Sequence, residues 1–251
     1  MLVMGILNET PDSFADGGRH NDLDAAISRG LEMIAEGVDI IDIGGESTRP
    51  GADRVSQEEE IARTIPVIAE LAKHGAKISI DTMRAITAEA AINAGASIIN
   101  DVSGGLADNT MLQTAARLQV PYIAMHWRGQ SKDMNSKAIY GDVVNEVIAE
   151  LNERIDAALD AGIDKDKLII DPGIGFAKDA EHNWAIIDSI DRFVAMGYPV
   201  LVGASRKRFL GGESPDEREQ ATIELTKRLG ATGIWAVRVH SVKPHKEVLS
   251  S

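Results

Sequence analysis

Short apolar runs rich in β-branched residues alternate with amphipathic segments along the whole chain. Each run is hydrophobic on both faces, as is typical of a parallel strand that is covered on both sides. Eight runs are predicted to be strands: Leu2–Leu7, Ile40–Ile43, Lys77–Ile80, Ser97–Ile99, Pro121–Met125, Leu168–Ile170, Pro199–Val202 and Ile234–Val239. Repeated strand–helix units predict a parallel sheet, and eight of them favour a closed (β/α)8 TIM barrel.

Helices are predicted between these strands, where apolar residues recur at helical spacing. Two such sets are Leu23, Ile27, Leu31 and Ile34, and Val143, Val147, Leu151, Ile155 and Leu159. Three strands are preceded by a glycine and a small residue, at Gly37-Val38, Gly75-Ala76 and Gly95-Ala96. A glycine just past a helix end supplies the left-handed residue that terminates the helix, so these steps mark helix ends.

The rival architecture is an open, doubly wound sheet. Its usual glycine-rich dinucleotide fingerprint after the first strand is missing, because Asn8-Glu9-Thr10-Pro11-Asp12 stands there instead. The sequence contains no linker, low-complexity tract or visible boundary. We therefore expect residues 1–251 to form a single barrel domain.

Composition narrows the classes of protein to which the chain can belong. Its 251 residues are 44% hydrophobic and 26% charged, which suits one compact domain. Cysteine is absent, which excludes a disulfide framework, a thiolate metal site and a cysteine nucleophile. A formal net charge of −13 argues against a nucleic-acid partner, since such binding needs basic residues that neutralise phosphates.

The hydropathy pattern also bears on where the protein works. No apolar run reaches the roughly 18 residues of a membrane span. The start, Met1–Leu7, lacks the basic flank and the cleavage site of a signal peptide. We expect a soluble cytoplasmic protein with no membrane partner.

Polar residues follow every predicted strand. In a (β/α)8 barrel the chemistry lies at the carboxyl ends of the strands, so these residues are candidates for a site. In chain order they are Asn8, the segment Gly44–Gly51, Asp81, Asn100-Asp101, His126, Asp171, Ser205-Arg206-Lys207 and Arg238-Val239-His240. Any one of them could merely cap the following helix. All eight together indicate a ligand site, because polar groups converge at a barrel mouth.

The strand-end side chains sort into two chemical kinds. Hydrogen-bond acceptors are supplied by Asp81, Asn100 and Asp171, and cations by Arg49, Arg238 and His240. A flat heterocycle with several N–H donors would suit the first set, and a phosphate-like anion the second. For the two arginines, the alternative is a salt bridge to one of the 39 acidic residues. Ser205 and Lys207 precede a predicted helix, whose free N–H groups favour an anion such as a carboxylate.

Seven ordered segments resemble the signatures of one family, the dihydropteroate synthases. They are Met4–Phe14, Gly44–Gly51, Ser79–Thr82, Ile99–Gly104, Asp171–Phe176, Gly203–Lys207 and Arg238–His240. Three further segments are most similar to the actinobacterial branch: Met125–Arg128, Phe176–Lys178 and Lys207–Gly211. Because the segments span nearly the whole chain, the resemblance implies the family's barrel and its activity in folate biosynthesis, which is a sulfonamide target.

The resemblance also implies roles for individual residues. The pterin ring would be bound by Asp81, Asn100, Asp171 and Lys207, with Gly175 also in the substrate site. The diphosphate would be bound by Asn8, Arg49, Arg238 and His240, with a magnesium ion near Asn8. The p-aminobenzoate would be bound by Phe14, Thr48, Pro50 and Ser205. The catalytic set would be Asp81, Asp171, Lys207, Arg49, Arg238 and His240.

The implied reaction is a dissociative substitution in a homodimeric enzyme whose partners are small-molecule substrates. Pyrophosphate would leave first, and the amine of p-aminobenzoate would attack the cationic pterin methylene that remains. The barrel must then stabilise a cation near its carboxylates and an anion near its arginines, so no protein nucleophile is required.

Three positions depart from the family pattern, and two other functions stay open. Glu9 stands where a small apolar residue is usual, Ala15 where serine is common, and Ser241 where aspartate is usual. Losing that aspartate would loosen the orientation of His240. A methyltetrahydrofolate–corrinoid methyltransferase would share the acceptor set but has no need of the diphosphate site. A non-catalytic pterin-binding paralogue is the third alternative, because a fold does not fix a function.

Overall fold

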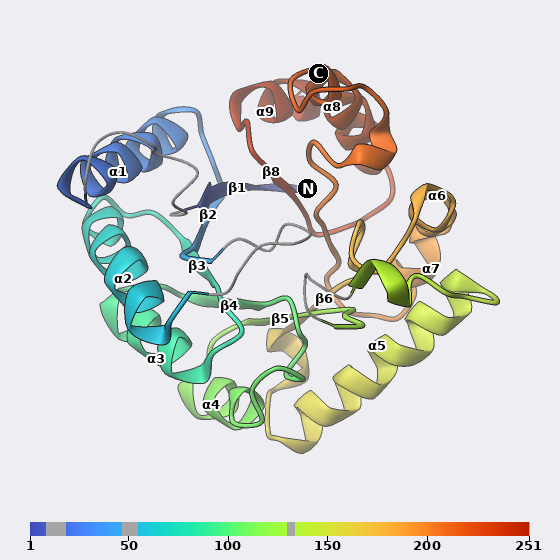
Figure 1. Ribbon diagram of the computed structural model, residues 1–251, viewed down its shortest axis with the longest axis horizontal. Coiled ribbons are helices and arrows are strands. Elements are labelled where there is room, and N and C mark those ends of the chain that lie inside the picture. Colours follow the sequence, from blue (N-terminus) through green and yellow to red (C-terminus); the bar gives the residue numbers. More distant parts are fainter. Residues whose placement is uncertain (9–18, 47–54, 130–133, 251) are drawn as a thin grey trace.

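The structure is a computed structural model that describes residues 1–8, 19–46, 55–129 and 134–250. Its centre is a sheet of eight parallel strands in the order β6-β5-β4-β3-β2-β1-β8-β7 (Figure 1). The strands are β1 (Leu2–Asn8), β2 (Ile40–Gly44), β3 (Ile78–Asp81), β4 (Ile98–Asp101), β5 (Tyr122–Met125), β6 (Leu168–Asp171), β7 (Leu201–Val202) and β8 (Ala236–Val239). A parallel bridge between Ile170 and Val200 joins the two ends of this order, which gives a nearly closed barrel.

Helices surround the strands on the outside (Figure 1). They are α1 (Arg19–Ala35), α2 (Gln57–Lys73), α3 (Ala85–Ala94), α4 (Met111–Leu118), α5 (Val143–Asp160), α6 (Ala180–Asp188), α7 (Ile190–Val194), α8 (Glu217–Leu229) and α9 (Lys243–Ser250). Short 3-10 turns are η2 (Met134–Lys137), η3 (Lys165–Lys167) and η4 (Arg208–Leu210). The predicted (β/α)8 TIM barrel is confirmed, and the doubly wound alternative is wrong.

All eight predicted strands are present, with shifted ends. The first, second, third and sixth strands extend by one residue, so that Asn8, Gly44, Asp81 and Asp171 belong to the sheet. The polar side chain does not stop the ladder, because pairing uses the backbone: Asn8 pairs with Gly44, and Gly44 with Asp81. The seventh strand is shorter than predicted, since Pro199 lies outside it.

The predicted apolar face is buried in α5 but shifted in α1. In α5 the predicted face is buried, with Val147 and Leu151 fully inaccessible. In α1 the most buried line is instead Ala26, Gly30 and Met33, whereas Leu31 is 36% exposed. The face is shifted because α1 approaches α2 closely: a Cβ on Gly30 would lie 2.4 Å from Leu71 Cδ1. The three predicted glycine helix ends, Gly37, Gly75 and Gly95, all have positive φ, as expected.

Alternate residues of each strand face the helices and the barrel interior. The outward set is mostly apolar and joins the main core, as Ile41 and Ile43 do in β2. The inward set starts with an apolar floor: Met4, Ile40, Ile98, Ile123, Ile169, Leu201 and Ala236. Two residues further along five of these strands stand Asp42, Asn100, Met125, Asp171 and Gly203. The interior therefore changes from apolar to mostly polar towards the carboxyl ends of the strands.

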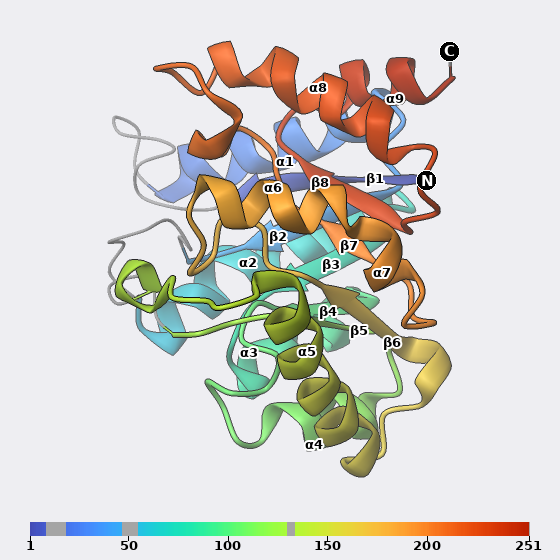
Figure 2. The same ribbon diagram turned by 90° about the vertical axis from the view of Figure 1, so that its right-hand side faces the viewer.

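Both chain termini lie at the end of the barrel where the strands begin (Figure 2). The carboxyl ends of the strands point to the opposite end, where the polar inward residues are. Within the described ranges, no helix is long and apolar enough to cross a membrane.

Candidate active site at the barrel mouth

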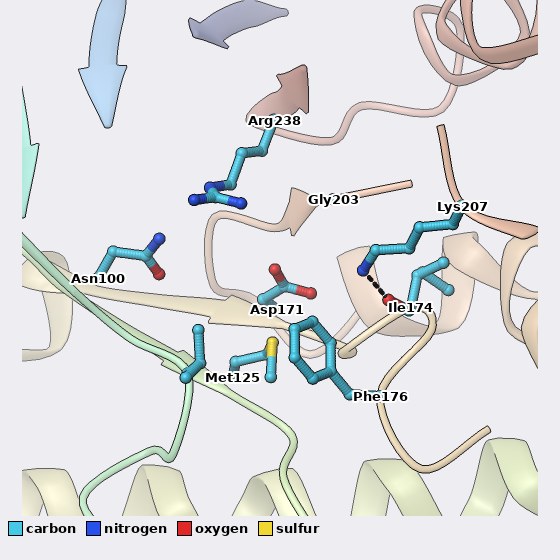
Figure 3. A pocket seen from close by; sticks show the side chains of 9 residues that line it. Asn100, Met125, Asp171, Ile174, Phe176, Gly203, Lys207 and Arg238 are labelled. Carbon is cyan, nitrogen blue, oxygen red and sulfur yellow. Dashed lines mark hydrogen bonds between the residues drawn. The ribbon is translucent and has the colours of Figure 1, made fainter. Parts of the chain in front are cut away.

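A hollow of about 330 Å³ opens at the carboxyl ends of the strands. It is lined by Asn100, Val102, Met125, Asp171, Ile174, Phe176, Gly203, Lys207 and Arg238. Figure 3 shows the side chains of Asn100, Asp171 and Arg238 directed towards the same space from three different strands. Four of the predicted site residues therefore meet in one cavity: Asn100, Asp171, Lys207 and Arg238.

Parallel register explains why residues far apart in the sequence meet here. Asn8, Gly44, Asp81 and Asn100 are successive register partners across β1 to β4. Neighbouring strands are about 4.8 Å apart, so partners in register present their side chains at one level of the barrel.

Arg238 crosses the interior from β8 to the opposite carboxylates. Its Nε donates to Asp42 Oδ2 at 2.6 Å, and its Nη2 donates to Asp81 Oδ2 at 2.8 Å. The side-chain amide of Asn100 also donates to Asp42 Oδ2, at 3.0 Å. The salt-bridge alternative for Arg238 is thus realised, and within the described ranges Nη1 is the guanidinium nitrogen left without a hydrogen bond. The Arg238 side chain also lines the cavity (Figure 3).

Two carboxylates of the mouth have pKa values that burial raises. Burial raises the pKa of Asp81 to about 7, and the charge of Arg238 opposes this shift while Asp42 adds to it. Burial likewise raises the pKa of Asp171, opposed by its bond from the Gly173 N–H. Since desolvation disfavours the charged form, a ligand that brings donors or positive charge to these groups would relieve the penalty.

Asp42 is a site residue that was not predicted. Its Oδ1 is buried and has no hydrogen-bond partner within the described ranges. The polar residue that ends each apolar run marks a candidate, whereas Asp42 lies inside the strand Ile40–Gly44. A carboxylate between buried isoleucines at an inward position was the available signal, because such a charge needs a partner.

Lys207 follows β7, and its side chain lies along the loop after β6. Its ammonium donates to the carbonyl of Ile174 and lies 4.4 Å from the centre of the Phe176 ring. Gly175, which has a φ of +76°, makes this approach possible, because a Cβ there would lie 2.6 Å from Lys207 Cδ. Burial lowers the pKa of Lys207 to about 8, and the carboxylate of Asp171 opposes the shift.

Ser205 and His240 are paired with one another. Ser205 Oγ lies 2.9 Å from His240 Nδ1 and accepts the His240 N–H at 3.2 Å. Ser241 does not take part, since its hydroxyl accepts from Arg206 Nη2 at 2.8 Å. The hydroxyl of Ser205, rather than a residue at position 241, therefore orients the His240 ring.

Two strand-end residues point away from the cavity. Asp101 accepts bonds from Ser103 and from the Tyr122 hydroxyl on the outer face of the sheet. His126 lies 2.8 Å from Glu150 of α5. Both follow from alternation along a strand, because each comes directly after an inward residue, Asn100 or Met125.

Asn8 Oδ1 and Asp81 Oδ2 both lie near Gly44, at the carboxyl ends of β1 and β3. A Cβ on Gly44 would lie 3.6 Å from both Asn8 Oδ1 and Asp81 Oδ2, so glycine leaves the space between them clear. Within the described ranges, no group of three acidic or histidine residues could enclose a metal. Two oxygens fit magnesium, which usually keeps several waters and takes further ligands from phosphates.

Four predicted substrate residues lie outside the described residues, as do two of the departures from the family pattern: Phe14, Thr48, Arg49 and Pro50, and Glu9 and Ala15. The two flanks of segment 47–54 are bound by one side chain that was not predicted, Arg84. Its Nη1 donates to Glu46 Oε2 at 2.8 Å and its Nη2 to the Val55 carbonyl at 2.6 Å.

Comparison with known proteins identifies the family. The model for pterin binding enzymes matches residues 4–240, and the chain belongs to this family. Its relatives there are dihydropteroate synthases. That of Mycobacterium leprae (strain TN) is 48% identical over 98% of this chain and 90% of its own length. That of Bacillus subtilis (strain 168) is 47% identical over 96% and 84%, respectively.

Solved structures agree with this relationship. Xanthomonas albilineans dihydropteroate synthase with 4-aminobenzoic acid is 43% identical, with a TM-score of 0.93 over 99% of this chain and 90% of that chain. The enzyme of the same species in complex with 7,8-dihydropteroate is 40% identical, with a TM-score of 0.89 over 99% and 91%. The family resemblance is confirmed. The actinobacterial placement stays a prediction, since the identities of 48% and 47% do not separate the branches.

Proposed function

We propose that the chain is a dihydropteroate synthase of folate biosynthesis. It would condense 6-hydroxymethyl-7,8-dihydropterin pyrophosphate with p-aminobenzoate to give 7,8-dihydropteroate and pyrophosphate. The observation that carries this proposal is the convergence of Asn100, Asp171, Lys207 and Arg238 on one cavity, in a chain 48% identical to such an enzyme. The neighbours that contain 4-aminobenzoic acid and 7,8-dihydropteroate support it.

The cavity chemistry suits a pterin ring. Asn100 and Asp171 offer oxygen acceptors to ring N–H and amino donors, and Asp81 belongs to the same polar network through Arg238. Met125 and Phe176 provide apolar surface for the flat faces of the ring.

The reaction would proceed as a dissociative substitution. The bond between the pterin methylene carbon and the pyrophosphate oxygen breaks, and its electron pair leaves with pyrophosphate. The amine of p-aminobenzoate then forms the new C–N bond and releases a proton. Buried carboxylates such as Asp171 would stabilise the transient cation, and Arg238 Nη1 would face the departing anion. Arg49, His240 and Asn8 remain proposed anion ligands, and Phe14, Thr48, Pro50 and Ser205 proposed p-aminobenzoate contacts.

We also propose a magnesium ion as cofactor, held by Asn8 beside the diphosphate. When bound, the ion would neutralise part of the charge on the pyrophosphate. Asn8→Ala should weaken magnesium binding to the protein with pyrophosphate by about tenfold, as titration calorimetry would measure. The exposed Asn152 provides the control Asn152→Ala, and equal magnesium affinity in all three proteins would contradict the assignment.

Lys207 is expected to matter for turnover rather than for folding. Burial lowers the pKa of Lys207 to about 8. The charged lysine therefore destabilises the fold increasingly as the pH falls from the ordinary pKa of lysine to about 8. Lys207→Met should therefore leave the melting temperature unchanged or raised at pH 7, and lower turnover by about 100-fold or more. Lys227→Met on the exposed face of α8 is the control. A large drop in melting temperature with turnover retained would reverse this assignment.

Release of pyrophosphate from the pterin diphosphate, with and without p-aminobenzoate, tests the proposed function. A synthase releases stoichiometric pyrophosphate and forms dihydropteroate when both substrates are present. A methyltransferase would instead transfer methyl from methyltetrahydrofolate to a corrinoid, and a non-catalytic paralogue would bind pterin without turnover. Two further expectations from the family, a homodimer and a cytoplasmic location, are checked by light scattering and by cell fractionation.

A further inference from the structure

Behind the cavity, four side chains form a continuous polar chain that the mechanism does not use. Lys178 Nζ lies 2.8 Å from His126 Nδ1, and His126 Nε2 lies 2.8 Å from Glu150 Oε2. Arg128 Nε donates to both oxygens of Glu150, at 3.0 and 3.1 Å. Lys178 is 8% exposed and His126 is 1% exposed, so the inner half of this chain is shielded from water.

The hydrogen bonds assign a protonation state to the buried pair. Besides His126 Nδ1, the ammonium of Lys178 donates to the carbonyls of Gly173 and Phe176, each at 3.1 Å. These three acceptors match the three donors of an ammonium group. Since His126 Nδ1 accepts, the ring carries its proton on Nε2 and donates it to Glu150.

The same arrangement keeps His126 neutral. Burial lowers the pKa of His126 to about 4, and the charge of Lys178 contributes to this shift while Glu150 opposes it. A second proton would have to sit on Nδ1, facing the ammonium. The imidazole therefore stays an acceptor for Lys178 across the neutral range.

The loop that Lys178 binds, residues 172–179, has an unusual backbone. Gly173, Gly175 and Ala177 have φ values of 70°, 76° and 47°. The left-handed region is accessible to glycine but strained for alanine, so bonds from outside must hold this shape. A Cβ on Gly173 would lie 2.4 Å from the His126 carbonyl, which shows how closely the loop packs on β5.

This loop also carries both contacts of Lys207. The ammonium of Lys207 bonds to the Ile174 carbonyl and lies over the Phe176 ring. Lys178 binds the carbonyls directly before and after these contacts, at Gly173 and Phe176. Two lysines thus bind one loop: Lys207 lies on the side of the cavity, and Lys178 lies on the opposite side of the loop.

We propose that Lys178, supported by His126, Glu150 and Arg128, is a positioning residue for the pterin site: it fixes the loop so that Phe176 and Lys207 are in place before the ring binds. The identity of the ligand rests on the proposed function.

Stability alone does not account for a lysine at this position. Burial lowers the pKa of Lys178 to about 7, with Asp171 opposing the shift and Lys207 and Arg128 adding to it. Lys178→Met would avoid this penalty but would leave His126 Nδ1 and the carbonyls of Gly173 and Phe176 without their donor. Because these two effects oppose each other, Lys178→Met should fold with only a small change in melting temperature at pH 7.

The effect is instead expected in pterin binding. Lys178→Met should weaken binding of 6-hydroxymethylpterin, measured by calorimetry, by about tenfold, which corresponds to about 1.4 kcal/mol. The KM for p-aminobenzoate should change by less than about twofold, because the loss is local to the pterin. Lys178→Gln retains an amide donor for the carbonyls, so its pterin affinity should fall between those of the wild type and Lys178→Met. Lys167→Met is the matched control, since Lys167 lies on the surface and pairs with Gln119 and Asp164.

A double-mutant cycle distinguishes positioning from general loosening. If Lys178 acts by placing the Phe176 ring, then in a Phe176→Leu background the loss of Lys178 should cost less than about threefold in pterin affinity. An equal tenfold loss in both backgrounds, or no loss in Lys178→Met alone, would overturn the proposal.

Hydrogen exchange of the ligand-free protein tests the positioning without any substrate. The Gly175 and Phe176 amides, bonded to Asn183 Oδ1 and to the Gly173 carbonyl, should exchange at least about tenfold faster in Lys178→Met. The amides of α9, far from the loop, should be unaffected. Unchanged exchange at Gly175 and Phe176 would refute the positioning role. Failure of the wild type to bind pterin would refute only the proposed function.

Discussion

Asp171→Asn is expected to abolish measurable pterin binding while the barrel stays folded. Asp171 Oδ1 accepts the Gly173 N–H at 2.7 Å, and its side chain borders the cavity (Figure 3). Either orientation of an asparagine amide would turn its NH2 group towards a donor, the Gly173 N–H or the ring. A buried donor left unpaired costs roughly 1–3 kcal/mol, and a ring bound through several donors loses more than one such bond.

Calorimetric titration of 6-hydroxymethylpterin into both proteins measures this effect. Asp171→Ala, which removes both oxygens, should lose binding as well. The exposed Asp156→Asn on α5 is the control and should bind as the wild type does. Affinity of Asp171→Asn within about twofold of the wild type would remove Asp171 from the pterin site and, with it, the main support for that assignment.

Strand ends were predictable because the signal is local. A polar residue that terminates an apolar run, such as Asp81 or Asp171, marks the carboxyl end of a strand in any parallel barrel. The sequence also predicted that these ends would form one mouth, since parallel register aligns them. Of the adjacent pair Asn100-Asp101, the predicted acceptor Asn100 lines the cavity, whereas Asp101 points outward to Tyr122.

Partners that depend on tertiary approach could not be predicted. The Arg238–Asp42 bond joins residues 196 positions apart, and the Lys178–His126 contact joins residues 52 apart. No periodicity specifies such pairs, because they depend on how the strands and loops meet across the barrel. The buried face of α1 was shifted for a similar reason: a glycine against Leu71 lets two helices approach, which a hydrophobic pattern does not register.

Arg238→Met is expected to lower the free energy of unfolding by about 3–5 kcal/mol at pH 7.5, because removing one member of a buried ionic cluster leaves the others uncompensated. Asp42 is fully buried and Asp81 is 5% exposed, and Arg238 is the cation that bonds to both. The Asn100 amide would remain as a donor to Asp42, but a neutral donor does not offset a buried charge.

The loss should depend on pH in a definite direction. Burial already raises the pKa of Asp81 to about 7 in the presence of Arg238, and removing the guanidinium would raise it further. A carboxyl whose folded pKa exceeds its unfolded value favours the fold most at pH values below about 4, and this contribution is lost as pH rises through the folded pKa. Denaturant unfolding at pH 5 and pH 7.5 should therefore show a smaller difference between the variant and the wild type at pH 5.

Arg228→Met, which breaks an exposed pair with Asp188, should shift stability by less than about 1 kcal/mol at either pH. If Arg238→Met were as mild as this control at pH 7.5, Asp42 and Asp81 would not need their arginine, and the guanidinium would be retained for the departing anion alone.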